Sequence, residues 1–111
     1  MDKKIVYLAI PYSHPDPDIR KMRFELANKM AAKLLEEEFN VLSPISHSHP
    51  ISLYMENSND SDYWTKNSLE FLKFCDELIV YCLPGWEGSK GVTKEIEFAK
   101  AKGIPIRYLE G

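Results

Sequence analysis

Two runs of apolar, β-forming residues, 5–10 and 77–83, have the pattern of strands that are buried on both faces. Two shorter runs, 40–43 and 104–108, predict further strands. Pro105 lies within the last run, and proline cannot donate to the hydrogen-bond ladder of a central strand. We therefore expect the last strand to lie at an edge of the sheet.

Between these runs, apolar residues recur at spacings of three and four, which predicts helices. The first covers about 17–38, with Asp16 as its N-cap and Pro17 as its first residue. The others cover about 60–74 and 92–102. The expected buried stripes are Ile19, Met22, Leu26, Met30 and Leu34 in the first helix, and Trp64, Ser68, Leu69, Leu72 and Cys75 in the second.

The segment 44–59 is rich in serine, histidine and proline, and we expect it to form a long loop. The alternation of strands and helices predicts one α/β domain over 1–111. Its expected architecture is three-layered and flavodoxin- or Rossmann-like, with a parallel sheet of four or five strands and helices on both faces. Ligands of such folds bind at the carboxyl ends of the strands, where the strand order changes direction. The expected site therefore draws on 9–14, 43–52 and 83–91.

Composition narrows the class of protein. The 111 residues are 44% hydrophobic and 28% charged, as in a globular domain, and the net charge is −3. A negative balance argues against duplex nucleic acid or an anionic membrane as the main partner. Cys75 and Cys82 lie in apolar runs and fit no disulfide or zinc-ligand pattern, so we interpret them as core residues. With no signal peptide or membrane span in the sequence, we expect a cytoplasmic protein.

A glycine-rich turn over 85–91 joins the third strand to the last helix. Such a junction offers free backbone N–H groups and the positive end of a helix dipole to an anion. Ser89 adds a hydroxyl donor and Lys90 a charge. The spacing fits neither a Walker loop nor a dinucleotide-binding loop, so a plain tight turn is the alternative.

Glu95 follows this turn on the last predicted helix. Val92, Ile96 and Ala99 form the inward stripe of that helix, and Glu95 lies at its flank, whereas Glu97 points to solvent. A partly desolvated carboxylate is a candidate nucleophile or general base. The alternative is a surface glutamate that gains from the helix dipole.

Polar and aromatic residues also gather in the other two segments. Arg20 or Arg23 could reach a phosphate, although a solvated helix face is the usual role of such residues. His47 and His49 have no nearby carboxylate or cysteine, so we expect a substrate-lining or structural role and no metal site. Trp86, exposed between glycines, could stack on a base, whereas Trp64 is expected in the core.

Residues 7–13, 43–47, 75–80 and 89–95 resemble the nucleoside 2-deoxyribosyltransferase-like superfamily. The resemblance covers nearly the whole chain and is nearest to a small branch of uncharacterised phage and bacterial proteins. Its most specific part is the pattern of Ser89, Gly91 and Glu95, which is similar to the motif of the 2′-deoxynucleoside 5′-phosphate N-hydrolases.

The resemblance implies that Glu95 attacks C1′ of the sugar and that Ser89 contacts the 5′-phosphate. It also implies that 10–13 line the sugar and phosphate, that 45–49 face the base, and that a homodimer forms in which the serine reaches the neighbouring subunit's site. No metal or organic cofactor is implied. The expected ligand contacts are Tyr7, Ile10, Pro11, Tyr12, Ser13, Ile45, His47, Trp86, Ser89 and Gly91, with Arg20 and Lys90 as further phosphate-binding candidates.

One position departs from the family pattern. The family has an aspartate eight residues before the position of Asp76, where this chain has Ser68; Asp62 replaces it only if the preceding loop folds back. The expected function is cleavage of the N-glycosidic bond of a (deoxy)nucleoside 5′-monophosphate, by hydrolysis or base exchange. The alternatives are a nucleotide-sensing module of the same fold, and a flavodoxin-like domain that acts through a protein partner.

Overall fold

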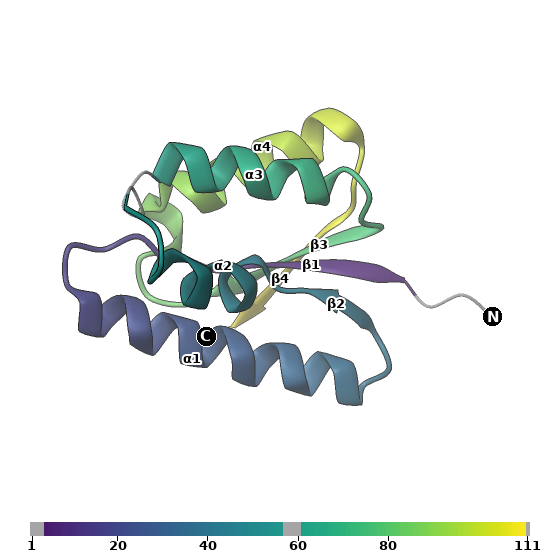
Figure 1. Ribbon diagram of the computed structural model, residues 1–111. Coiled ribbons are helices and arrows are strands. Elements are labelled where there is room, and N and C mark those ends of the chain that lie inside the picture. Colours follow the sequence, from purple (N-terminus) through teal and green to yellow (C-terminus); the bar gives the residue numbers. More distant parts are fainter. Residues whose placement is uncertain (1–3, 57–60, 111) are drawn as a thin grey trace.

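The computed structural model describes residues 4–56 and 61–110, which form three layers around a parallel sheet (Figure 1). The strands are β1 (Ile5–Ala9), β2 (Asn40–Leu42), β3 (Glu77–Cys82) and β4 (Ile106–Glu110). Their order is β2-β1-β3-β4, and every neighbouring pair is parallel. This confirms the predicted α/β fold and the edge position of the last strand.

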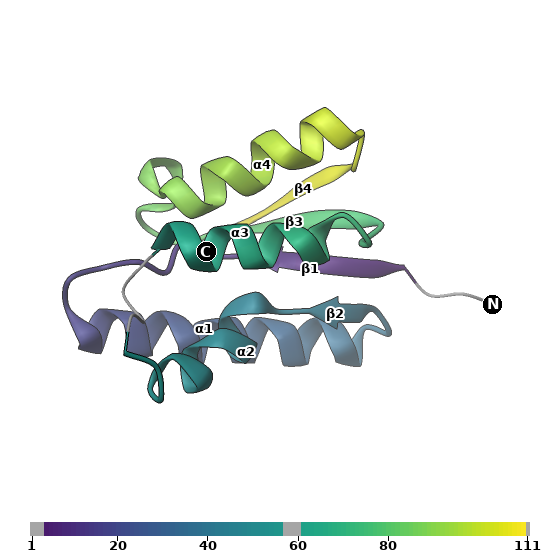
Figure 2. The same ribbon diagram turned by 45° about the horizontal axis from the view of Figure 1, so that its top comes forward.

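The helices cover both faces of the sheet. Helices α1 (Pro17–Glu36) and α2 (Pro44–Ser52) lie on one face, and α3 (Ser61–Leu72) and α4 (Lys90–Lys102) lie on the other (Figure 2). A short 3-10 turn, η1 (Trp86–Gly88), precedes α4. None of the described helices is long and apolar enough to cross a membrane.

Helix α1 begins as predicted, because the Asp16 carboxylate accepts a hydrogen bond of 2.8 Å from the Asp18 backbone N–H. Its buried stripe differs from the prediction. The buried residues are Ala27, Ala31 and Leu34, whereas Met22 is 47% exposed. Small alanines let the helix backbone approach the sheet closely, so the larger Leu26 and Met30 are left half-buried at the flanks.

The predicted loop over 44–59 is wrong over 44–52, which form helix α2; positions 57–60 lie outside the described residues. Pro44 is compatible with this helix because a first-turn residue needs no N–H partner. Pro50 lies in the last turn, where a lost hydrogen bond affects only the helix end. There the Ser52 hydroxyl donates to the His49 carbonyl at 2.7 Å.

Helix α4 begins at Lys90, two residues before the predicted start. The cause is Ser89, whose Oγ accepts a hydrogen bond from the Val92 N–H at 3.2 Å and thereby caps the helix. The helix ends at Gly103, whose φ of 73° is the left-handed conformation that favours glycine.

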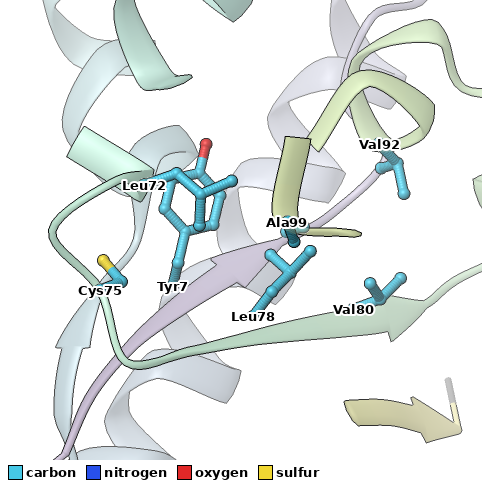
Figure 3. Close-up of a cluster of buried hydrophobic side chains, with 8 residues drawn as sticks. Tyr7, Leu72, Cys75, Leu78, Val80, Val92 and Ala99 are labelled. Carbon is cyan, nitrogen blue, oxygen red and sulfur yellow. The ribbon is translucent and has the colours of Figure 1, made fainter. Parts of the chain in front are cut away.

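A hydrophobic cluster fills the space between the sheet and helices α3 and α4 (Figure 3). Its members are Tyr7, Ala9, Leu72, Cys75, Leu78, Val80, Val92 and Ala99. The two cysteines are free thiols; Cys75 belongs to this core, as expected, and Cys82 is half-buried beside it. Tyr7 brings a phenol hydroxyl into the apolar cluster, and that hydroxyl needs a partner.

Candidate functional site

A cavity of about 1130 Å³ lies at the carboxyl end of β1. The chain runs from β1 to β2 on one side and then crosses to β3 on the other, so this is where the strand order changes direction. All three segments expected to form the site contribute, through residues such as Tyr12, Ile45 and Ser89. The cavity is as large as ordinary small-molecule sites, which measure about 300–1,000 Å³.

Glu95 projects from α4 into the wall of this cavity and is only 8% exposed. The buried stripe of α4 is Val92, Glu95 and Ala99, and Ile96 is half-buried. Glu95 therefore lies within the buried stripe of α4 and not, as the sequence predicts, at its flank. Burial in apolar surroundings raises the pKa of Glu95 from 4.5 to about 8, because it disfavours the charged form.

Tyr7 is fully buried on β1, behind Glu95, and its phenol O–H donates a hydrogen bond to Glu95 Oε2. This bond favours the carboxylate and opposes the effect of burial on the pKa of Glu95. Burial, followed by the charge of Glu95, raises the pKa of Tyr7 well above its usual value, so the phenol keeps its proton. Tyr7 therefore acts through Glu95 and does not itself line the cavity.

Ser68 on α3 lines the cavity and lies near the Tyr7 hydroxyl, where it lowers the pKa of Tyr7. Tyr7 therefore lies between Ser68 and Glu95, and the hydrogen bond that it donates goes to Glu95. Asp62 does not replace the missing aspartate: it is exposed, lies outside the cavity and pairs with Lys94 at 3.1 Å.

The glycine-rich turn contributes Ser89 and Gly91 to the cavity, whereas Lys90 is exposed and does not line it. A methyl group built on Gly91 would lie 3.6 Å from Thr65 Oγ1, an ordinary contact, so steric fit does not require glycine there. The hydroxyl hydrogen of Ser89 stays available for an anion, since its oxygen accepts from the Val92 N–H.

Tyr12, Ser13 and Arg20 line the cavity on the side of α1. Arg20 donates a hydrogen bond to the His14 carbonyl, which holds its guanidinium against the loop after β1. Arg23 lies outside the cavity and donates to the Ser13 carbonyl at 3.2 Å. Arg20 is thus the arginine positioned to reach a bound anion.

The two histidines of α2 point in different directions. His47 is exposed and outside the cavity, whereas His49 lines it. His49 Nδ1 lies 2.5 Å from the Tyr12 hydroxyl, and its ring stacks on Phe24 with 4.3 Å between ring centroids. The spacing of Ile45, Ser48, His49 and Ser52 is helical and indicates this face, although the serine, histidine and proline content of the segment predicts a loop.

Three other sequence expectations need correction. Trp86 is half-buried and packs against Tyr108, with 5.6 Å between ring centroids, so it is not presented to the cavity. Pro11 is buried outside the cavity. Trp64, expected in the core, lines the cavity instead. Glycine neighbours do not by themselves expose an aromatic ring when a neighbouring strand such as β4 covers it.

Over residues 4–56 and 61–110, no three side chains of histidine, cysteine, aspartate or glutamate are grouped to hold a metal ion. Residues 4–110 match the model of a family described as a domain of unknown function, DUF1937. The chain belongs to this family. A search of curated proteins finds no match. The match covers every element of the sheet and the whole cavity, so the site described here lies within the family's domain.

Proposed function

We propose that the protein cleaves the N-glycosidic bond of a (deoxy)nucleoside 5′-monophosphate, with Glu95 as the nucleophile. The observation that carries this proposal is a carboxyl group buried in the cavity wall at the switch point of the sheet. A buried titratable group with a strongly shifted pKa in a cleft is typical of a functional site.

The chemistry follows from this group. Glu95 attacks C1′ as the bond from C1′ to the base breaks, and the electron pair of that bond leaves with the base. The product is a glycosyl ester of Glu95. Water then releases the sugar in a hydrolase, or a second base takes it in a transferase. A 2-deoxy sugar suits this route, because no 2-hydroxyl withdraws electrons from the oxocarbenium-like transition state.

Ser89, Gly91 and Arg20 line the same cavity and offer a hydroxyl, a helix N-terminus and a cation to a 5′-phosphate. An anion at this position favours nucleotides over nucleosides and, with them, hydrolysis over base exchange. The family resemblance adds a homodimer to the proposal. The reaction itself uses no metal or organic cofactor.

A nucleophile must be ionised, and the pKa of Glu95 near 8 means that it holds a proton at neutral pH. The value of kcat/KM should therefore rise with pH and level off above about pH 8. The Tyr7 hydrogen bond supports the reaction because it stabilises the carboxylate.

The test is chromatography of a panel of deoxynucleoside monophosphates after incubation with the protein. Free base should appear with the wild type and not with Glu95→Gln. Glu97→Gln is the matched control, since Glu97 is an exposed glutamate of the same helix and should leave base release unchanged. Equal base release by Glu95→Gln and the wild type would rule out Glu95 as the nucleophile.

A second candidate function is nucleotide sensing without turnover. It is favoured by Ser68, which lies near Tyr7 at the position where the resembling family has an aspartate. In that case no nucleotide loses its base, yet nucleotides still raise the unfolding temperature, and Glu95→Gln alters that shift.

A further inference from the structure

A second polar cluster lines the cavity on the side of helices α1 and α2, across the sheet from α4 (Figure 2). It consists of His49, Tyr12, Phe24 and Arg20. The proposed reaction at Glu95 leaves the role of His49 open. His14, Asp18 and Lys21 on the same wall are also titratable but exposed, whereas the His49 ring is half-buried.

The His49 ring is held from two directions. Phe24 stacks on its face, with 4.3 Å between the ring centroids and 20° between the planes. The Tyr12 hydroxyl lies 2.5 Å from Nδ1. Stacking fixes the plane of the imidazole, and the hydrogen bond fixes the orientation of the ring within that plane. Such a ring is preorganised for contact with a ligand.

The tautomer follows from the donor assigned to this hydrogen bond. Burial raises the pKa of Tyr12, so its hydroxyl keeps its proton, and we assign that hydroxyl as the donor to His49 Nδ1. The ring proton of His49 then resides on Nε2. Burial, followed by the charges of Arg20 and Lys21, lowers the pKa of His49, so the ring is a neutral N–H donor at neutral pH.

We propose that His49 donates a hydrogen bond from Nε2 to the departing base, which makes it the leaving-group residue of the proposed reaction. This inference rests on the proposed function. When the bond from C1′ to the base breaks, its electron pair stays on the base and spreads to a carbonyl oxygen or imino nitrogen. An N–H donor aimed at that atom stabilises the developing charge. The base then takes its proton from water.

The test compares two substrates with different leaving groups. One is the nucleotide that the wild type cleaves, and the other is 2-deoxyribose 5-phosphate with a 4-nitrophenoxy group at C1′, which leaves as 4-nitrophenolate. Nitrophenolate spreads its charge into the nitro group and needs no donor from the protein. The variant is His49→Phe, which keeps the stack on Phe24 and deletes both ring nitrogens.

With His49→Phe, kcat on the nucleotide should fall by about 100-fold, the usual loss on removing one such donor. The nitrophenyl substrate should be cleaved at nearly the wild-type rate. His49→Gln restores a neutral N–H donor and should recover part of the loss. His47→Ala is the matched control, because His47 is exposed on the same helix and outside the cavity.

Equal losses on both substrates, or no loss on either, would overturn the role of His49 while leaving Glu95 in place. The proposed function fails in a different way. A wild type that cleaves neither substrate, or a Glu95→Gln variant that cleaves both, refutes the reaction and this inference with it.

Discussion

Burial of the Glu95 carboxyl group predicts that the protein loses stability as the pH rises. The pKa of Glu95 is about 8 in the folded protein and near 4.5 in the unfolded chain. Between these values the folded protein binds a proton that the unfolded chain has released, so the free energy of unfolding falls with increasing pH. The difference between these two pKa values corresponds to about 5 kcal/mol of free energy of unfolding, a large part of the ~5–15 kcal/mol that stabilises an ordinary domain.

The assay is urea unfolding at pH 6 and pH 9 for the wild type and for Glu95→Gln. Glutamine matches glutamate in size and has a carbonyl oxygen that can accept the Tyr7 hydrogen bond, but it does not titrate. Between pH 6 and pH 9, the free energy of unfolding of the wild type should fall by about 2.5 kcal/mol more than that of the variant. The comparison cancels other titrations, such as that of Cys75, whose pKa burial raises to about 11.

The two proteins can also differ in free energy of unfolding by an amount that is the same at both pH values. Such a constant difference would reflect only the buried amide of the Glu95→Gln variant, whose polar atoms are imperfectly paired. The pH-dependent difference is therefore the diagnostic quantity. Parallel loss of stability in wild type and variant would show that Glu95 ionises at an ordinary pKa, and the argument for a desolvated carboxyl group would fall.

Three further predictions follow from the same geometry. Tyr7→Phe removes the donor to Glu95, so the rise of kcat/KM with pH should move to higher pH, as measured by a pH–rate profile; an unmoved profile would contradict the role of Tyr7. Ser68→Asp should increase base release if the missing aspartate is what limits turnover, and unchanged chromatograms would favour the sensing function. Gly85→Ala should cost about 1–2 kcal/mol in urea unfolding, because Gly85 has a φ of 93° and a methyl group there would lie 3.3 Å from Arg23 Nη2; a neutral effect would contradict the strain.

The fold could be predicted because each strand is either a continuous apolar run or a short one between clear helix signals. Asp16 and Pro17 also predict the start of a helix, and α1 begins at Pro17 with Asp16 as its N-cap. The stripe of α1 was less predictable. Apolar spacing locates a helical face only to within about one residue, and the choice between Leu26 and Ala27 depends on how closely the helix approaches the sheet.

The site was predicted best where sequence position and strand topology coincide. Ser89, Gly91 and Glu95 lie at the start and in the second turn of α4, which follows β3 after a short connection, so local chain geometry sets their place at the end of the sheet. For His49, the resemblance implies a position facing the base, but the sequence predicts a loop where the structure has helix α2. Serine, histidine and proline all have modest or poor helix propensity, so α2 is a helix that tertiary packing stabilises against local preference.

The two buried carboxylates of the described chain, Glu77 and Glu95, differ in how their charge is compensated. Glu77 is 5% exposed and pairs with Arg107 at 3.2 Å and Lys4 at 3.9 Å, so its charge is compensated within the fold. Glu95 faces a cavity, and among residues 4–56 and 61–110 it has the Tyr7 hydroxyl as a partner but no cation within ion-pair distance. Ionisation of Glu95 therefore costs several kcal/mol of desolvation, which an apolar side chain at position 95 would avoid. In the reaction that we propose, the positive charge that develops at C1′ in the transition state would compensate the carboxylate.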